Sequence, residues 1–369
     1  FFFEVKDYEK RMPDSTRATE IGKDDATVRY KRGAPAYFLQ KYPEAFGDLD
    51  KAIAGGVSVA DAFDMRGYCR YDAGEFAAAI ADYDKAIVYN DKLASAYFHR
   101  GDAKFRVEKP ETAIEDYTRA VQLGVKDPVL FNNRGKAYFN LENYAPAIAD
   151  FSEAITRNAE YTKAYDNRGN AHYKTGKFEE PIRDFRMVEK LTSKPDPSLY
   201  HLLGESYYNT DKKPAAMEYY TKAIEGGIKD KGVFYRRGLL NLENEDFRAA
   251  LLDLENAANA GENTVQLHLT KGRIYVSLED QKSAIAELNK ALQIDPRNVD
   301  AHFNRGLVKE TLEDFEGAIE DYTAVIKLNP DDGVAYYNRA NCKASLDNIG
   351  AGIADMDEGA VVSTPGMFC

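Results

Sequence analysis

Cysteine is scarce in this chain, and its three cysteines lie far apart. Cys69, Cys342 and Cys369 make no disulfide framework, and none belongs to a CxxC pair of the kind that binds zinc or carries redox chemistry. Long apolar runs are also missing, so no segment is long enough to cross a membrane as a helix. These absences exclude a disulfide-stabilised scaffold and give no sign of membrane insertion.

Blocks of charge of one sign are absent as well. The 49 Lys and Arg residues are interspersed with 61 Asp and Glu residues, and the formal net charge is −12. A nucleic-acid-binding surface needs cations to neutralise phosphates, so this balance argues against a nucleic-acid partner and favours basic or neutral ones. Hydrophobic residues make up 44% of the chain, which is enough to bury a large core and argues against disorder.

Catalytic and metal-binding motifs are missing too. The histidines are scattered without HExxH or close ligand spacing: His99, His172, His201, His268 and His302. No glycine belongs to GxGxxG or GxxxxGK[ST]. Cys69 and Cys342 occupy apolar places and are interpreted as core thiols, whereas Cys369 is a candidate for an intermolecular bond. The sequence therefore predicts no enzyme, no cofactor and no metal site.

What the chain has instead is a repeat. Gly306 recurs at a spacing of 34 residues, with one step of 35, and Ala340 takes the tenth place: Gly33, Gly67, Gly101, Gly135, Gly169, Gly204, Gly238, Gly272 and Gly306. A fixed period of this length is typical of stacked helical repeats. The period divides the chain into ten units: 26–59, 60–93, 94–127, 128–161, 162–196, 197–230, 231–264, 265–298, 299–332 and 333–366.

Each unit carries two apolar-periodic runs of helical length, which predict two helices. Pro110, Pro146, Pro181 and Pro214 fall in the opening turn of a second helix, where a missing N–H costs least. Glycine at the eighth place and mostly alanine at the twentieth face an aromatic residue or leucine at the twenty-fourth. Small residues opposite large ones predict close approach of the helices.

The NRG, AIxDY and LNP segments of these units resemble the tetratricopeptide (TPR) repeat, and the resemblance covers residues 26–366. It implies an all-α fold, an α-α superhelix (TPR solenoid) of antiparallel helix pairs whose first helices line a concave groove. Residues 1–25 are then an N-terminal leader and residues 367–369 a C-terminal tail. Pro181 in place of a small alanine, and Gly352 and Gly359 in the tenth unit, depart from the family pattern.

Two places of the repeat vary together, which predicts a contact. Eight units carry Arg at the seventh place and Asp at the twenty-third, among them Arg134/Asp150, Arg168/Asp184 and Arg305/Asp321. The eighth unit keeps the charges with Lys271/Glu287, and the sixth replaces both members with Leu203/Tyr219. We expect partly buried ion pairs across each helix pair; exposed pairs that matter little for stability are the alternative.

Two further sets of residues are candidates for a partner-binding groove. An amide can donate to and accept from an extended peptide backbone, and the places that face the groove in the family carry Asn133, Asn167, Asn170, Asn304, Asn338 and Asn341. The twelfth place is aromatic in six successive units: Tyr37, Tyr71, Phe105, Phe139, Tyr173 and Tyr208. Asparagine that is simply common in this repeat type, and aromatic packing between units, are the competing interpretations.

The carboxylate clamp of relatives that bind chaperone tails is not expected. The nearest placement offers Asn133 and Lys163, but Phe98, Asp102 and Asn167 occupy the other places. Asp102 would repel a C-terminal carboxylate. The sequence therefore favours a partner peptide or domain of another kind.

The chain ends suggest self-association. A solenoid needs polar caps on its terminal faces, whereas this chain carries apolar residues at both ends: Phe1, Phe2, Phe3, Met367, Phe368 and Cys369. Head-to-tail contacts between identical rods propagate into an open fibre. Two hypotheses follow, a scaffold that binds a peptide or partner domain in its groove, and a structural subunit of a filament. The first residue is Phe1 instead of Met, which indicates a processed product, such as an extracytoplasmic one, or an incomplete one. No signal peptide is recognisable, and the compartment is not predicted.

Overall fold

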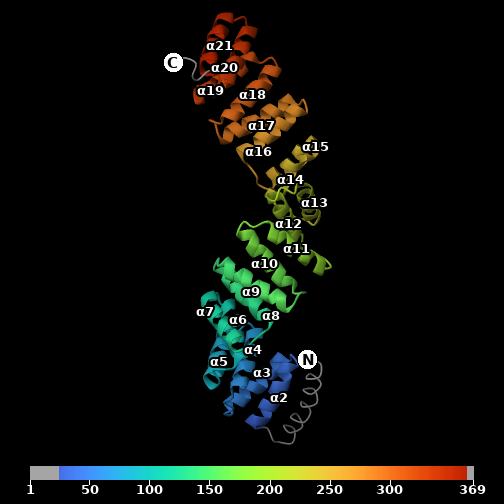
Figure 1. Ribbon diagram of the computed structural model, residues 1–369, viewed down its shortest axis with the longest axis vertical. Coiled ribbons are helices and arrows are strands. Elements are labelled where there is room, and N and C mark those ends of the chain that lie inside the picture. The colour runs from blue at the N-terminus through green and yellow to red at the C-terminus, as the bar shows by residue number, and fades with distance from the viewer. Residues whose placement is uncertain (1–24, 364–369) are drawn as a thin grey trace. The chain divides into compact units, whose positions relative to one another are not determined.

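The computed structural model describes residues 25–363, which contain twenty α-helices and no strand (Figure 1). The helices group into two compact units, residues 1–195 and 196–369, which are described separately. In the first unit the helices are α2 (Ala26–Phe38), α3 (Tyr42–Ala54), α4 (Ala60–Asp72), α5 (Phe76–Tyr89), α6 (Ala94–Arg106), α7 (Pro110–Gln122), α8 (Pro128–Asn140), α9 (Tyr144–Arg157), α10 (Thr162–Lys174) and α11 (Glu179–Leu191).

The second unit continues the same alternation. Its helices are α12 (Pro197–Asn209), α13 (Lys213–Glu225), α14 (Lys231–Glu243), α15 (Phe247–Asn259), α16 (Val265–Ser277), α17 (Gln281–Ile294), α18 (Val299–Thr311), α19 (Phe315–Leu328), α20 (Gly333–Ser345) and α21 (Ile349–Ser363). The all-α fold and the two helices per repeat are confirmed. Each first helix begins at the first residue of a predicted 34- or 35-residue repeat.

The two helices of a repeat are joined by a short loop that reverses the chain. In eight of the ten loops a residue other than glycine adopts a left-handed conformation, with φ of 57–60°: Gln40, Glu108, Glu142, Asp211, Glu245, Glu279, Glu313 and Asp347. The next N–H then bonds back to a carbonyl of the preceding helix, as from Asn143 to Tyr138 at 2.9 Å. This αL helix end satisfies carbonyls that the helix leaves open.

The predicted glycine stops lie between repeats. Gly56, Gly124 and Gly227 have φ of 97–101°, and the apolar residue after each one bonds back to the helix, as from Val125 N to the Ala120 carbonyl at 3.1 Å. Glycine adopts this conformation without a steric penalty, so these residues end α3, α7 and α13 and turn the chain toward the next repeat.

The core of each helix pair is built around the recurring glycine. A Cβ on Gly135 would lie 2.7 Å from Cε1 of Phe151, whereas one on Gly238 would lie 3.1 Å from Cγ of Leu254. The large partner at the twenty-fourth place is fully buried in both pairs. The predicted packing of a small residue against a large one is therefore present, and it is tightest where the partner is aromatic.

The predicted leader lies outside the described residues except for Asp25, whose side chain accepts from the N–H of Val28 at 2.8 Å and caps α2. The tail, residues 367–369, also lies outside them. So do all six residues predicted for self-association: Phe1, Phe2, Phe3, Met367, Phe368 and Cys369.

Candidate functional site

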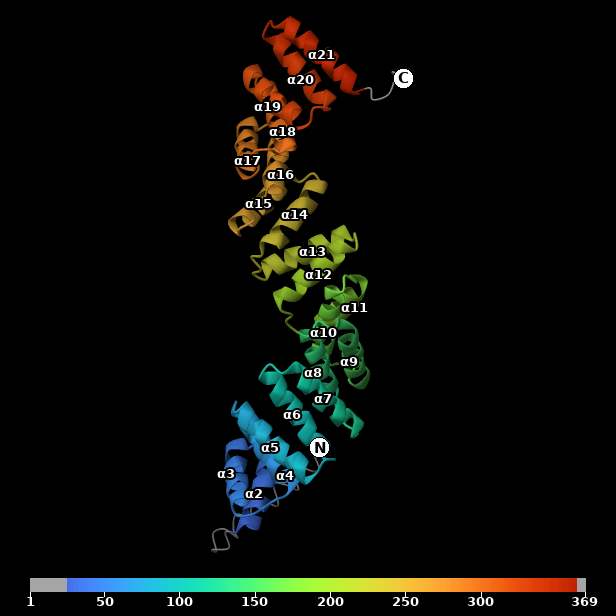
Figure 2. The same ribbon diagram turned by 90° about the vertical axis from the view of Figure 1, so that its left-hand side faces the viewer.

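In the first unit, the first helices of neighbouring repeats lie side by side. Helix α2 contacts α4, α4 contacts α6, α6 contacts α8 and α8 contacts α10 (Figure 2). In the second unit α16 contacts α18 in the same way. The surface that these helices form in each unit is called the first-helix face below. Nine of the twelve groove candidates lie on these helices, whereas Tyr208 lies on α12 and Asn338 and Asn341 lie on α20, which are also first helices.

Each Arg–Asp pair is a bidentate contact between the two helices of a repeat. Arg134 donates from Nε and Nη2 to the two carboxylate oxygens of Asp150, both at 2.7 Å. Arg168 donates to Asp184 in the same way, at 2.9 and 2.6 Å. The other pairs with this geometry are Arg32/Asp48, Arg66/Asp82, Arg100/Asp116, Arg237/Asp253, Arg305/Asp321 and Arg339/Asp355.

The two departures from the pair behave as their chemistry requires. Lys271 donates to Glu287 at 3.0 Å in the eighth repeat, and both side chains are buried. In the sixth repeat Leu203 and Tyr219 are both buried. An apolar pair thus takes the place of the ion pair, and no buried charge is left without a counter-charge.

The third nitrogen of the arginine reaches the preceding repeat, which the sequence reasoning missed. Nη1 of Arg100 donates to Asp84 at 2.6 Å, and Nη1 of Arg168 donates to Oγ of Ser152 at 3.0 Å. The acceptor always lies sixteen residues earlier, on the second helix of the preceding repeat. The same bond joins Arg66 to Asp50, Arg134 to Thr118, Arg237 to Thr221, Arg305 to Asn289 and Arg339 to Thr323.

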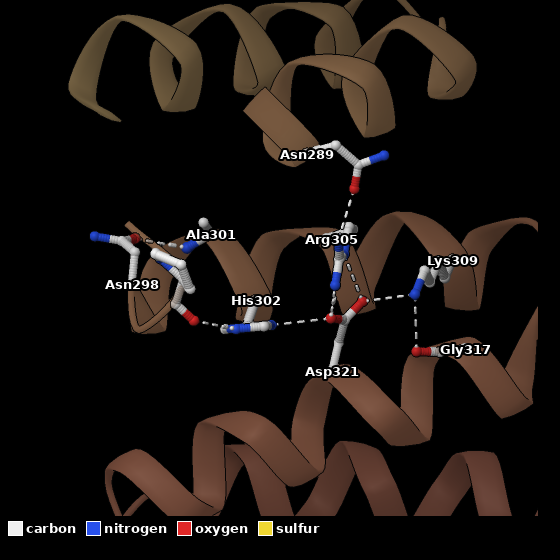
Figure 3. Close-up of polar contacts among 9 residues, drawn as sticks. Asn289, Asn298, Ala301, His302, Arg305, Lys309, Gly317 and Asp321 are labelled. Carbon is white, nitrogen blue, oxygen red and sulfur yellow. Dashed lines mark hydrogen bonds and ion pairs between the residues drawn. The ribbon is translucent and has the colours of Figure 1, made fainter. Parts of the chain in front are cut away.

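The ninth repeat shows the complete arrangement (Figure 3). Arg305, Lys309 and His302 all contact the carboxylate of Asp321, at 2.5–3.2 Å. Burial alone would raise the pKa of Asp321, but these three donors outweigh burial and lower the pKa below its usual value. The charged groups of this pair are thus already bonded within the chain.

The asparagine candidates are half-buried, and several of their amides bond within the face. Nδ2 of Asn133 donates to Asp102 of the preceding repeat at 2.9 Å, and Nδ2 of Asn167 donates to Asn132 at 2.8 Å. Nδ2 of Asn304 donates to the carbonyl of Asp300 at 2.7 Å. In Asn167 and Asn304 the amide oxygen is the better candidate for a bond to a partner, whereas that of Asn133 accepts from Nδ2 of Asn132 at 3.4 Å.

The six aromatic residues of the twelfth place pack against other side chains of the compact unit to which they belong. Tyr37, Tyr71, Phe105, Phe139 and Tyr208 each lie against a cluster of buried core residues. Tyr173 packs edge-on against Phe178, with ring centroids 5.4 Å apart. Packing therefore accounts for this strip, and its partner-binding role stays a prediction.

The first-helix face of the first unit contains two acidic side chains, Asp64, which is buried, and Asp102, which is half-buried. Nδ1 of His99 lies 2.9 Å from Oδ1 of Asp64, and Ser95 donates to the other oxygen at 2.7 Å. Burial by itself lowers the pKa of His99, but the charge and hydrogen bond of Asp64 outweigh it and raise the pKa. Burial raises the pKa of Asp102, although Tyr117 and Asn133 donate to it. Both carboxylates are therefore already bonded to partners within the chain.

The second unit has a hollow in its first-helix face, which the sequence reasoning missed. A pocket of about 150 Å³ lies between α16 and α18, with a rim and floor formed by Arg273, Val276, Gln281, Asn304, Leu307, Val308 and Thr311. Val276 is 46% exposed and Leu307 is 39% exposed. The signal in the sequence was the end of the aromatic run, because Val276 holds the place that is aromatic in the first six repeats.

Other kinds of site have no support in the described residues. Within residues 25–363 no group of three or more His, Cys, Asp or Glu side chains is placed to hold a metal ion. None of the described helices is long and apolar enough to cross a membrane. Cys69 and Cys342 are buried as predicted, and burial raises their pKa values to about 12 and about 11.

The repeats match models of a known protein family. Models described as tetratricopeptide repeat match residues 98–162, 132–191, 197–225 and 299–332, and a model described as TPR repeat matches residues 67–107 and 272–313. A search of curated proteins finds no match.

Several solved structures are similar to parts of the chain. YrrB, described as a TPR protein with an unusual peptide-binding site, is 19% identical, with a TM-score of 0.45 over 51% of this chain and 96% of that one. MamA is 24% identical, with a TM-score of 0.41 over 43% of this chain and 93% of that one. The C-terminal part of a TPR repeat-containing protein from Cytophaga hutchinsonii is 19% identical, with a TM-score of 0.47 over 74% and 98% of the two chains.

Proposed function

Because this chain belongs to the tetratricopeptide repeat family, we propose that it is a non-catalytic scaffold that binds a peptide or a partner domain against its first-helix faces. The observation that carries the proposal is the hollow between α16 and α18. There, the apolar side chains of Val276 and Leu307 are exposed beside polar groups that can bond to a peptide backbone.

The chemistry of the hollow suits one apolar side chain of an extended peptide. Val276 and Leu307 offer exposed apolar surface, and covering such surface favours binding. The amides of Asn304 and Gln281 at the rim can exchange hydrogen bonds with the peptide backbone, and Arg273 favours an acidic or carbonyl group nearby. An apolar recess with a few polar groups around it is the usual form of a recognition pocket.

A peptide selection tests this function directly. A random peptide library displayed on phage is selected against the purified chain, and the enriched peptides are titrated against wild type and against Leu307→Glu. We expect the charge in the hollow to weaken binding at least about tenfold, which corresponds to about 1.4 kcal/mol.

Leu252→Glu is the matched control. Leu252 lies on α15, a second helix, and is 59% exposed, so its replacement should leave the affinity unchanged. Peptides that bind Leu307→Glu as tightly as wild type, or the absence of any enriched peptide, would contradict the proposal.

End-to-end assembly of copies is a second candidate, and one observation favours it. Ile349, Ile353 and Met356 form a stripe on α21 and are 62%, 56% and 42% exposed, whereas Tyr322, the counterpart of Met356 in the ninth repeat, is fully buried. A second copy that covered this stripe would bury apolar surface. Sedimentation velocity across a concentration series should then show association that Ile353→Glu abolishes; a wild-type chain that stays monomeric rules the candidate out.

A further inference from the structure

A second pocket lies at the junction of the first and second repeats, within the first unit. Its volume is about 340 Å³, and its lining comes from the start of α3 and from the end of α4 and the loop after it: Tyr42, Pro43, Phe46, Cys69, Arg70, Asp72, Ala73 and Glu75. None of these residues is a groove candidate, and nothing in the scaffold proposal uses this site.

The pocket lies at Ala73, which is the smallest residue found at the fourteenth place of the repeat. The fourteenth place holds Ala73 in the second repeat, where six other repeats hold leucine or valine: Leu39, Val107, Leu141, Leu278, Leu312 and Leu346. A larger side chain at Ala73 would extend over the start of α3. This place lies at the surface, since Ala73 is exposed and Leu312 and Leu346 are 47% and 38% exposed, and the small side chain of Ala73 leaves the recess uncovered.

The walls of the pocket are aromatic and its rim is acidic. Tyr42 and Phe46 are half-buried, and Asp72 and Glu75 are exposed. Within residues 25–363 neither of these two carboxylates forms an ion pair. The site therefore presents two negative charges beside aromatic rings, an arrangement that favours a cation.

Arg70, which also lines the pocket, does not neutralise the charges of Asp72 and Glu75. Arg70 lies over the ring of Phe46, with its guanidinium carbon 5.7 Å from the ring centroid. Its Nη1 donates to Asp82 at 2.8 Å, and Asp82 also holds Arg66, whose own Nη1 bonds to Asp50. Two arginines and two aspartates thus balance one another, and Asp72 and Glu75 remain as an excess of negative charge.

The same place in other repeats is occupied by a cation from the chain itself. Lys213 stands where Tyr42 stands in the first repeat, and its ammonium lies 2.9 Å from Glu243, the counterpart of Asp72. Arg106, also a counterpart of Asp72, lies over Phe76 with its guanidinium carbon 5.2 Å from the ring centroid. The fold therefore accepts a basic side chain at this position, either on a carboxylate or over an aromatic ring.

We propose that this pocket binds a lysine side chain of a partner peptide, with the alkyl stem against Tyr42, Phe46 and Ala73 and the ammonium between Asp72 and Glu75. In the first repeat the partner supplies the cation that Lys213 supplies in the sixth. A lysine side chain has the required form, because its stem packs on apolar surface while its charged end stays near water.

The test uses the full chain and short probe peptides followed by NMR. The probes are acetyl-Gly-Lys-Gly amide and its norleucine and glutamate analogues, which keep the stem without the charge or reverse the charge. We expect the lysine peptide to shift the amide signals of Tyr42–Phe46 and Asp72–Glu75 in a saturable way, at least about tenfold more tightly than either analogue, with an affinity that falls as salt rises.

Two kinds of variant make the test specific. Ala73→Leu places the common residue of the other repeats in the pocket and should abolish the shifts while the chain keeps its fold by circular dichroism. Asp72→Asn should weaken the lysine peptide at least about tenfold, whereas Asp91→Asn, the same charge change in an exposed loop, should not. Equal binding of the norleucine peptide, undiminished binding to Ala73→Leu, or no saturable shift at these residues would overturn the proposal.

Discussion

Arg305 and Asn289 belong to neighbouring repeats, and Nη1 of Arg305 donates to the amide oxygen of Asn289 at 2.6 Å (Figure 3). The same guanidinium holds Asp321 through its other edge. One side chain therefore joins three helices, the two of its own repeat and the second helix of the repeat before. This contact recurs in seven repeats, and it gives the stack a polar tie in addition to its apolar core.

Removal of one partner of the ion pair should destabilise the chain more than removal of both. Asp150→Ala leaves Arg134 partly buried without its counter-charge and should lower the free energy of unfolding by about 1–3 kcal/mol. Arg134→Leu/Asp150→Tyr, which copies the buried Leu203/Tyr219 pair, should largely restore it. Urea denaturation of the four proteins of the cycle measures the coupling, and near-additive costs would show that the two side chains act independently.

The cost of replacing a recurring glycine with alanine should depend on the large side chain that faces it. Gly135→Ala brings a Cβ to 2.7 Å from Phe151, so the ring must move, and we expect a loss of about 1–3 kcal/mol. Gly238→Ala meets Leu254 at 3.1 Å, where a small shift suffices, and should cost clearly less. Thermal unfolding of both variants compares them; an equal or reversed order would contradict the packing argument.

The contact between His99 and Asp64 should make stability depend on pH. Asp64 raises the pKa of His99 above its usual value, so the contact stabilises the fold fully below the pKa of an unfolded histidine and is lost as pH rises through the raised value. Asp64 and Asp102 are the charged groups that face this ring. The difference in unfolding free energy between wild type and His99→Gln should therefore shrink from acidic to alkaline pH; a flat or growing difference would contradict it.

An aromatic residue at the twelfth place of the eighth repeat should close the hollow. Val276→Phe restores the residue type found at Tyr37 and Phe139, and the ring should cover the space between α16 and α18. We expect unchanged or higher thermal stability together with loss of the selected peptides in fluorescence anisotropy. Retained peptide binding with a stable fold would show that the hollow is not the binding site.

The two described cysteines should be inert in the folded chain. Burial raises the pKa values of Cys69 and Cys342 to about 12 and about 11, so little thiolate is present at neutral pH. Mass spectrometry after brief treatment with iodoacetamide should find neither residue alkylated until denaturant is added. Rapid alkylation of either one in the native chain would contradict the burial.

The sequence predicted the helices accurately because the period repeats ten times. Each first helix starts at the first residue of a predicted repeat. Lys271/Glu287 and Leu203/Tyr219 identify the paired places because both members change together. The left-handed loop residue was not predicted, since Glu142 and its counterparts carry nothing that demands this conformation. The conformation follows from the short loop that has to join the two helices of the repeat.

The candidate site was predicted less well, for a physical reason. Whether an asparagine amide is free to bind a partner depends on side chains about one repeat away. Asn133, for example, bonds to Asp102 of the preceding repeat, and the sequence of a single repeat does not contain that information. The third bond of the arginine was missed because its acceptor changes from Asp84 to Thr118 to Ser152, so no residue type is shared. Hollows likewise arise from side chains that are too small, such as Val276 and Ala73, and a pattern search does not look for these.

Site-specific photo-crosslinking tests the central claim, that the first-helix face of the second unit binds a partner peptide. A photoreactive benzoyl-phenylalanine is placed at Thr311, on the rim of the hollow, or at Leu252 on α15, and each protein is irradiated with a peptide selected from the library. The account predicts a crosslink from Thr311 and none from Leu252. A crosslink from Leu252 alone, or equal yields from both positions, would contradict it.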